Sequence, residues 1–128
     1  MKPKTKITAY WGATALVLFA LLSGGLANLL HQRDTIEGLR LIGFPAYVAT
    51  IVGTWKLLGF AALLLPGLPR ATEWAYAGTV FLLTSAAASH AFSADYGAYA
   101  YHIFVPLTFA ALALVSRALR PAARAVAA

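Results

Sequence analysis

Cysteine is absent from the 128 residues of this chain, and acidic residues are scarce, with only four in total. Without thiols the chain can form no disulfide, no thiolate metal site and no thioether link to haem. Charged residues of all kinds make up 11% of the sequence, whereas 61% of it is hydrophobic. A soluble fold of this composition would have too few polar residues to cover its surface, so we expect an integral membrane protein.

The net charge of +6 does not indicate a nucleic-acid-binding protein, because the basic residues lie mostly near the two ends of the chain. Positive charge beside apolar segments marks the cytoplasmic side of a membrane protein. If the N-terminus is cytoplasmic, seven basic residues fall inside and two outside: Lys2, Lys4, Lys6, Arg70, Arg117, Arg120 and Arg124 against Arg33 and Arg40. We therefore expect both termini in the cytoplasm and no nucleic-acid partner.

Four mainly apolar stretches are long enough to cross a bilayer as helices, which takes about 20 residues. They cover about residues 7–30, 46–65, 73–93 and 101–119. The first is longer than the core of a signal peptide. Pro66 and Pro69 follow the second stretch and Pro121 follows the fourth, where each would stop a helix. The sequence predicts an all-α fold, a membrane four-helix bundle that forms one domain over residues 1–128.

The first outer loop, DTIEGLRLIGFP, has features of a short helix. Asp34 could cap its N-terminus, and Glu37 follows three residues later in the manner of a capping box. Gly43 and Pro45 would end the segment. We expect a short amphipathic helix that lies on the outer face of the bundle.

Lys56 lies in the middle of the second stretch, in the run GTWKLLGF. A charge at that depth costs about 2.5 to 3.5 kcal/mol on insertion scales. On a helical wheel Lys56 shares a face with Ala49, Gly53 and Gly59, and small residues let another helix approach closely. We therefore expect Lys56 to point into the bundle. There it would either form a buried ion pair, have its ammonium capped by backbone carbonyl groups, or face a ligand or a proton path.

Two ionisable residues mark opposite ends of the third stretch, 17 positions apart, or about 25 Å along a helix. Glu73 is at the cytoplasmic end, where the helix dipole favours a carboxylate. We assign it, with Trp74 and Tyr76, a structural or ion-pairing role. His90 is near the outer end, close to the reach of Lys56, and Glu37 could approach from the loop above.

Metal and hydrolase sites find little support in the spacing of the histidines. His31, His90 and His102 would fall at a similar outer depth, and histidine is a common metal ligand. However, they lack a local ligand spacing such as HxxxH, so we predict no metal site. The chain also has no GxSxG element, which argues against a serine hydrolase.

Several motifs, GFPAY, GTWKLLG, LLLPGLPRATEWAYAG, the stretch ending in SAAASH, and SRALRP, resemble those of the DoxX-like family of small bacterial four-helix membrane proteins. The resemblance spans about residues 39–121. The matching positions are Gly43, Pro45, Lys56, Gly59, Pro66, Glu73, Trp74, Tyr76, Gly78, His90 and Pro121.

The resemblance implies four transmembrane helices and a multi-pass location in the bacterial inner membrane. It implies little about activity, since related DoxX proteins are linked to membrane oxidoreductases, thiol stress and quinone chemistry. The lack of cysteine argues against a direct thiol role for this chain.

Our leading hypothesis is a non-catalytic or accessory membrane protein that binds a small hydrophobic molecule, a quinone or a lipid. The expected pocket opens to the outer side. Lys56 would hold the polar head, His90 would exchange a proton, Glu37 would set their charge, and Trp55 and Phe60 would flank the ring or tail. The alternatives are a redox enzyme subunit or proton-coupled carrier, and a structural subunit without a ligand. Partners would be the lipid bilayer and oxidoreductase subunits or further copies of the chain.

Overall fold

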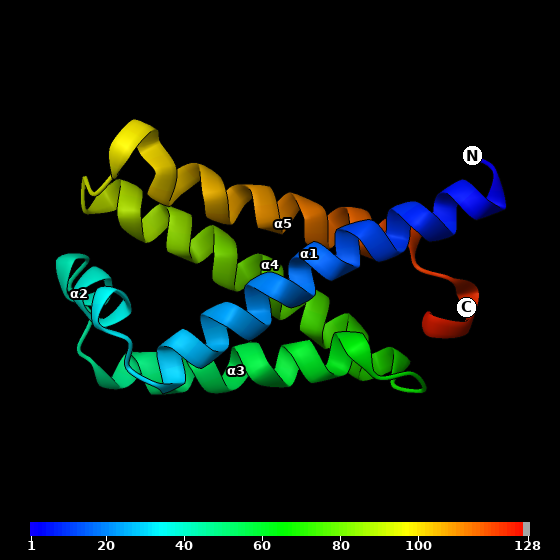
Figure 1. The fold of residues 1–128 in the computed structure, drawn as a ribbon, viewed down its shortest axis with the longest axis horizontal. Coiled ribbons are helices and arrows are strands. Elements are labelled where there is room, and N and C mark those ends of the chain that lie inside the picture. Colours follow the sequence, from blue (N-terminus) through cyan, green and yellow to red (C-terminus); the bar gives the residue numbers. More distant parts are fainter. Residues whose placement is uncertain (127–128) are drawn as a thin grey trace.

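The computed structural model describes residues 1–126, apart from the side chain at position 99, and these residues form an all-α fold (Figure 1). This confirms the predicted class. The five α-helices are α1 (Pro3–Leu29), α2 (Arg33–Leu41), α3 (Tyr47–Leu64), α4 (Pro69–Phe92) and α5 (Tyr101–Leu119). Two single turns of 3-10 helix, η1 (Ala98–Ala100) and η2 (Ala122–Arg124), precede and follow α5.

The four long helices pack so that each contacts two others. α1 lies against α3 and α5, and α4 lies against the same two helices from the opposite side. In Figure 1 α1 crosses over α4, while α3 and α5 lie on either side of this crossing. α2 lies against α1 and α3, at the end where these two helices are joined by the first loop.

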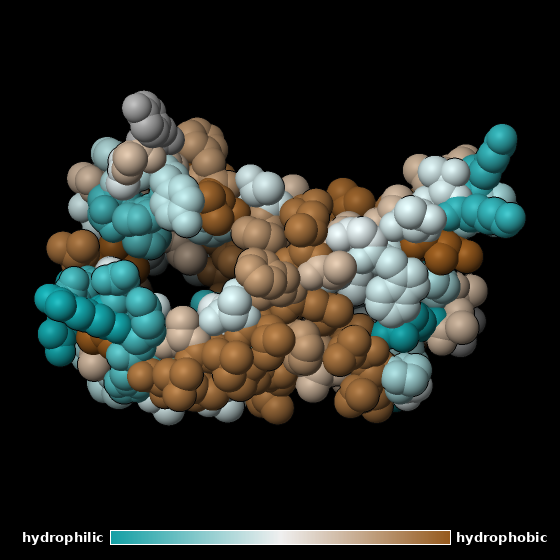
Figure 2. All heavy atoms as spheres, in the orientation of Figure 1, coloured by the Kyte–Doolittle hydropathy of each residue, from teal (hydrophilic) through white to brown (hydrophobic). Residues whose placement is uncertain are grey.

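Three helices in residues 1–126 are long and apolar enough to cross a membrane, namely α1, α3 and α5. α4 is also long, with 24 residues, but it carries Arg70, Glu73, His90 and several hydroxyl groups that lower its hydropathy. Many large apolar side chains on the long helices, α4 included, are exposed, among them Phe19, Phe81 and Phe104. A broad hydrophobic surface is visible along α3 in Figure 2, as expected for a protein whose solvent is lipid.

The two prolines between α3 and α4 have different roles. α3 ends at Leu64, before Pro66, and Gly67 turns the chain with a φ of +77°. Pro69, by contrast, is the first residue of α4, because a helix's first position needs no N–H donor and suits the fixed φ of proline. The third stretch was expected to start at about residue 73, and α4 begins four residues earlier.

The short helix of the first loop exists as α2, but its cap differs from the predicted one. The side-chain oxygen of Gln32 accepts a hydrogen bond from the backbone N–H of Thr35, at 3.0 Å. Asp34 lies inside the first turn, and Glu37 pairs with Arg33 one turn back, at 3.1 Å. The prediction of a capping box formed by Asp34 and Glu37 was thus wrong, because α2 already starts at Arg33, one residue before Asp34.

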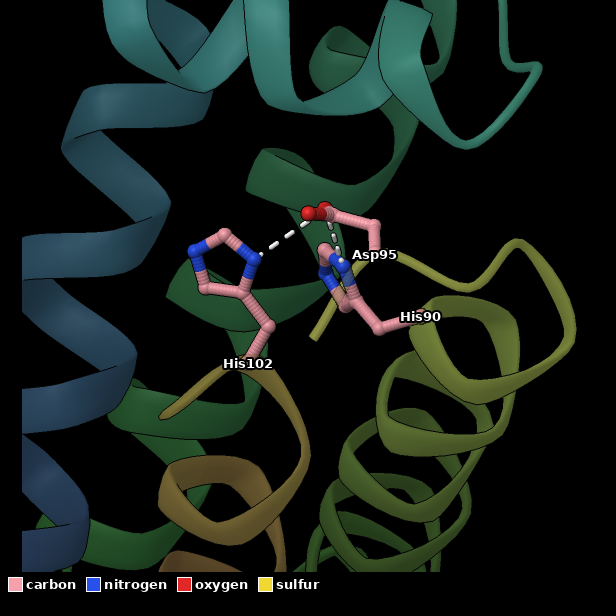
Figure 3. Close-up of side chains that lie close together, drawn as sticks. All are labelled: His90, Asp95 and His102. Atoms are coloured by element: carbon pink, nitrogen blue, oxygen red, sulfur yellow. Dashed lines mark hydrogen bonds and ion pairs between the residues drawn. The ribbon is translucent and has the colours of Figure 1, made fainter. Parts of the chain in front are cut away.

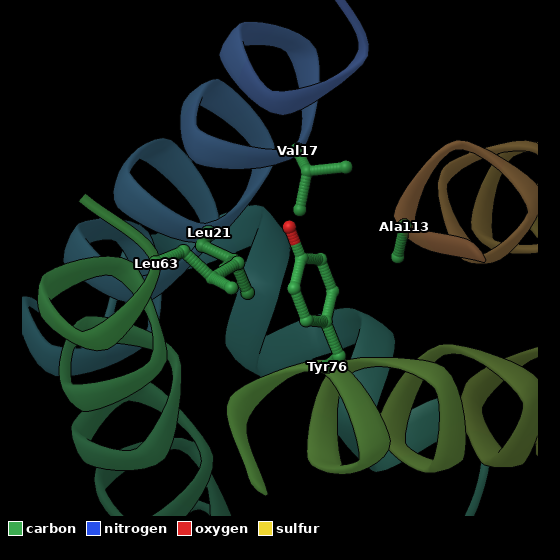
Figure 4. Close-up of a cluster of buried hydrophobic side chains, with 5 residues drawn as sticks. All are labelled: Val17, Leu21, Leu63, Tyr76 and Ala113. Atoms are coloured by element: carbon green, nitrogen blue, oxygen red, sulfur yellow. The ribbon is translucent and has the colours of Figure 1, made fainter. Parts of the chain in front are cut away.

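The core of the assembly combines an apolar cluster with a chain of buried hydroxyl groups. Figure 4 shows the cluster, in which the Tyr76 ring points between α1 and α5 toward Val17 and Ala113. The Tyr76 hydroxyl is 2.7 Å from Oγ of Ser116, and Ser116 Oγ is 2.6 Å from Oγ1 of Thr14. These three buried side chains connect α4, α5 and α1 through hydrogen bonds.

The contact between α1 and α3 depends on glycine. A Cβ atom on Gly53 would lie 2.9 Å from the carbonyl oxygen of Gly25 and 2.9 Å from the Cβ of Asn28. Real Cβ atoms do not approach backbone so closely, so only glycine allows the two helices to meet at this distance. This close approach brings Asn28 of α1 beside the middle of α3.

Candidate functional site

A cavity of about 780 Å³ lies between α3 and α4. Trp55 and Trp74 line it with strongly exposed rings, 67% and 82% accessible. Leu21 of α1 also reaches it. The other lining residues are Val52, Lys56, Leu58, Gly59, Ala62, Arg70, Ala71, Ala75, Gly78, Thr79 and Leu82. A cavity of this size with mostly apolar walls and few polar groups is typical of a small-molecule site.

Small residues create this space. Gly59 and Ala62 of α3 face Ala71, Ala75 and Gly78 of α4, and all five line the cavity. A Cβ atom on Gly78 would have no neighbour within 4 Å. The two helices are therefore adjacent here without filling the space between them.

Lys56 is one of two basic side chains that line this cavity, and its partner is an amide. Its Nζ donates a hydrogen bond to Oδ1 of Asn28, at 2.8 Å. Its stem lies over a pair of glycines in α1, where a Cβ on Gly24 would be 3.1 Å from Nζ. Lys56 forms no ion pair within residues 1–126. The prediction that Lys56 forms a buried ion pair, one of the alternatives above, is therefore wrong. Lys56 bonds instead to the neutral amide oxygen of Asn28.

The predicted ligand-binding residues lie in three different parts of the structure. Lys56 and Trp55 line the α3/α4 cavity, whereas Phe60 packs against the apolar core. His90 and Glu37 line a second cavity of about 420 Å³ under α2, where Figure 2 shows the surface hollowed. Asn28 also lines this second cavity, so the Asn28–Lys56 hydrogen bond lies between the two spaces.

Two of the three histidines meet beside the second cavity, around a carboxylate that sequence analysis missed. Oδ2 of Asp95 is 2.9 Å from Nδ1 of His90 and 3.0 Å from Nδ1 of His102, as Figure 3 shows. The hydrogen bond from His90 holds the pKa of Asp95 below its usual value, and that from His102 adds to the effect. Asp95 is therefore ionised at neutral pH and accepts from both rings. His31 lies elsewhere, with Nε2 2.9 Å from Oγ1 of Thr50.

The loop after α4 brings these groups together through left-handed backbone conformations. Ala94, Gly97 and Ala100 have φ values of 55°, 60° and 60°. The backbone N–H of Asp95 donates to the carbonyl of His90, at 2.9 Å. A Cβ on Gly97 would be 3.2 Å from the His102 ring, so glycine is needed both for its φ and for this contact. Alanine gives no signal of such a turn, which is why the sequence did not indicate this cluster.

The residues assigned a structural role lie at the opposite end of α4. Glu73 forms a two-fold hydrogen-bonded pair with Arg117 at 3.0 to 3.2 Å and also pairs with Arg120. Tyr76 is buried and bonded to Ser116. Trp74 is different, because it is exposed and lines the α3/α4 cavity.

Comparison with known proteins gives one match. No curated protein and no solved structure matches the chain. The model of the DoxX-like family matches residues 12–116, which include α1 from its third turn, all of α2, α3 and α4, and most of α5. Both cavities and the His90–Asp95–His102 cluster fall inside the matched range. This chain is a membrane protein that belongs to the DoxX-like family.

Proposed function

We propose that this chain is a multi-pass protein of the bacterial inner membrane that binds a small amphipathic molecule, a quinone or a lipid, between α3 and α4. In this proposal it is an accessory component and not itself an enzyme. α1, α3, α4 and α5 all cross the bilayer, and both termini are cytoplasmic. With 18 to 27 residues each, these helices would be about 27 to 40 Å long, enough for a hydrocarbon layer of about 30 Å.

The observation that carries the proposal is the presence of Lys56, with no carboxylate partner among residues 1–126, in the wall of the α3/α4 cavity. An ammonium group has three N–H donors, and Asn28 accepts one of them. The remaining donors are available to a carbonyl, phenolate or phosphate oxygen. Ionisable groups at this depth in a membrane protein are commonly functional.

The shape of the cavity suggests how the molecule lies. The lining residues of α3 run from Val52 to Ala62, which is about 15 Å along the helix. Lys56 is near the middle of the membrane and Arg70 is at the predicted cytoplasmic end. A quinone would place its ring at Lys56 between the two tryptophans. A lipid would place its phosphate at Arg70 and its tail along the small residues.

The test is the identity and amount of the organic molecule that leaves with the purified protein, measured by mass spectrometry. We expect a quinone or lipid in wild-type protein extracted from its native membrane in mild detergent. Gly78→Leu should displace it by filling the cavity. Gly12→Leu is the matched control, because Gly12 is equally open but lies on α1 away from the cavity.

Two further variants separate the ligand classes. Lys56→Met should remove a bound quinone and leave a lipid in place, whereas Arg70→Gln should do the reverse. Equal retention of the molecule in wild-type, Gly78→Leu and Lys56→Met proteins would contradict the proposal. It would leave this chain as a structural subunit without a ligand in this cavity.

A proton-coupled carrier or redox subunit is the second candidate, and one observation favours it. Asn28, the partner of Lys56, also lines the second cavity together with His90 and His102. Polar groups thus extend from the second cavity to the α3/α4 cavity. A carrier predicts proton uptake into liposomes that Lys56→Met abolishes, and a passive binding protein predicts none.

A further inference from the structure

We propose that His90, Asp95 and His102 form a binding site for a divalent transition metal ion, with Zn²⁺ as its representative. The cluster lies at the end of α4 and the start of α5, apart from the α3/α4 cavity, so the proposal is independent of the ligand proposed there. Each residue offers one ligand atom, and these atoms all lie within 4.8 Å of one another.

The distances suit one ion at the centre of the cluster. Nitrogen and oxygen ligands of Zn²⁺ are about 2.0 to 2.2 Å from the metal, so neighbouring ligand atoms of a tetrahedral site are separated by about 3.3 Å. The carboxylate oxygen of Asp95 is 2.9 Å from one ring nitrogen and 3.0 Å from the other. An outward movement of a few tenths of an ångström would admit the ion. Each neutral imidazole would then carry its proton on Nε2.

The ligand types favour a transition metal over Mg²⁺ or Ca²⁺. Two imidazoles and one carboxylate suit Zn²⁺, Fe²⁺ and similar ions, whereas Mg²⁺ and Ca²⁺ prefer oxygen ligands alone. Three protein ligands also leave a coordination position for water or another small ligand. His90 and His102 line the second cavity, so water or another small ligand can reach this coordination position from the cavity.

The charges around the second cavity are unusual for this basic chain. Asp34 and Glu37 line the cavity, and Asp95 bonds to two histidines of its wall. Three of the four acidic residues in the sequence are thus gathered here, although the net charge is +6. One of them, Glu37, already pairs with Arg33. The side chains of His90, Asp95 and His102 are only 17%, 21% and 35% exposed, so the cluster is partly sheltered but still open to ions.

The backbone holds the ligands in place before any ion arrives. Asp95 is fixed to the end of α4 by its N–H bond to His90, and the N–H of His102 donates to the carbonyl of Tyr96, at 3.3 Å. Ala94 and Ala100 keep left-handed conformations that are unfavourable for alanine. A site with preset ligands binds an ion without the cost of ordering the loop.

The experiment measures Zn²⁺ binding by the full chain in detergent, after chelator treatment and with a purification tag that contains no histidine. Isothermal titration should give about one Zn²⁺ per chain, and Co²⁺ should give visible absorption bands when it occupies the same site. We expect His90→Gln, Asp95→Asn and His102→Gln each to weaken binding at least about 10-fold. His31→Gln is the matched control, since its ring bonds to Thr50, and it should bind as wild type does.

Thermal unfolding with and without Zn²⁺ provides a second measurement. Zn²⁺ should raise the melting temperature of wild type and His31→Gln, and should leave the three cluster variants unchanged. The melting temperature without metal shows whether each variant is folded, and any one folded variant is sufficient for the comparison. The proposal is overturned if wild type binds no Zn²⁺, or if the cluster variants bind it as tightly as His31→Gln does.

Discussion

The ammonium nitrogen of Lys56 lies 2.8 Å from the amide oxygen of Asn28, so the charge in the middle of α3 is bound to a neutral group of α1. Asn28 is itself only 4% exposed. This pair differs from an ion pair in how it responds to mutation. Replacing Lys56 by an apolar residue removes the desolvation cost of a buried charge. Replacing Asn28 leaves the Lys56 ammonium without its hydrogen-bond acceptor.

The first prediction compares the two halves of this pair. Lys56→Met should leave the melting temperature in detergent equal or higher, because the loss of a buried charge offsets the unbonded Asn28 amide, which costs about 1 to 3 kcal/mol. Asn28→Leu should destabilise by about 2 kcal/mol. The double variant should recover most of that loss. A large drop in melting temperature for Lys56→Met, without a similar drop for the double variant, would contradict the expected asymmetry between Lys56 and Asn28.

The second prediction concerns the close contact of α1 and α3. Gly53→Ala should lower the free energy of unfolding by about 1 to 3 kcal/mol, because its Cβ would meet the Gly25 carbonyl at 2.9 Å. Gly78→Ala, in open space, should be neutral or stabilise by about 0.5 to 1 kcal/mol. Thermal unfolding of the two variants side by side checks the packing. Equal effects would show that α1 and α3 are further apart than described.

A third prediction ranks the ion pairs of Glu73. The side chain of Arg120 is 9% exposed and that of Arg117 is 51% exposed. Glu73→Gln leaves Arg120 without its carboxylate, so we expect a loss of about 1 to 3 kcal/mol. Arg117→Gln should cost less than about 1 kcal/mol. Added salt should reduce the effect of Arg117→Gln more than that of Glu73→Gln.

The fourth prediction tests the cap of α2. Gln32→Ala should loosen this helix by about 1 kcal/mol, because it removes the acceptor for the Thr35 N–H. Asp34→Ala should have a smaller effect, since its carboxylate only favours the helix dipole. Hydrogen exchange of the α2 amides measures both. Faster exchange in Asp34→Ala than in Gln32→Ala would restore Asp34 as the cap.

The fifth prediction is the orientation in the membrane. A reporter that is active only in the cytoplasm should be active when fused after residue 128, because most of the basic flanking residues lie on the side of the termini. A reporter that is active only in the periplasm should be active when fused in the loop between α4 and α5. The reverse pattern would place the second cavity and its histidines on the cytoplasmic side.

The sequence predicted the helices well where composition alone defines them. α1, α3 and α5 are long apolar runs, and their ends agree with the predicted ones to within four residues. The start of α4 also lies four residues before the predicted one, because Pro69 was read as ending a helix and instead begins one. The matched DoxX-like family confirms the resemblance drawn from the motifs.

The candidate sites were less predictable, because they depend on how helices cross. Small residues around Lys56 indicated that another helix would lie close to this face, and that helix is α1, but nothing local identifies Asn28, 28 positions away, as the partner of Lys56. His90 and His102 were considered as ligands, and their meeting depends on Asp95 and on a loop whose alanines adopt left-handed conformations. Sequence spacing contains no information about such a turn.

The hydroxyl chain of Thr14, Ser116 and Tyr76 has a consequence for how a molecule would enter the protein. In lipid, apolar surface does not drive helices together, so hydrogen bonds and close packing decide which helices stay associated. These hydroxyl groups tie α1, α4 and α5 together, whereas α3 is held to α1 by glycine contacts and the Lys56–Asn28 hydrogen bond. Within residues 1–126 a single side-chain hydrogen bond, from Thr72 of α4 to the carbonyl of Ala62, joins α4 to α3 near the loop between them. Separation of α3 from α4 should therefore be easiest beyond this bond, which makes the entrance a lateral gap that faces the acyl chains of the membrane and not the water on either side.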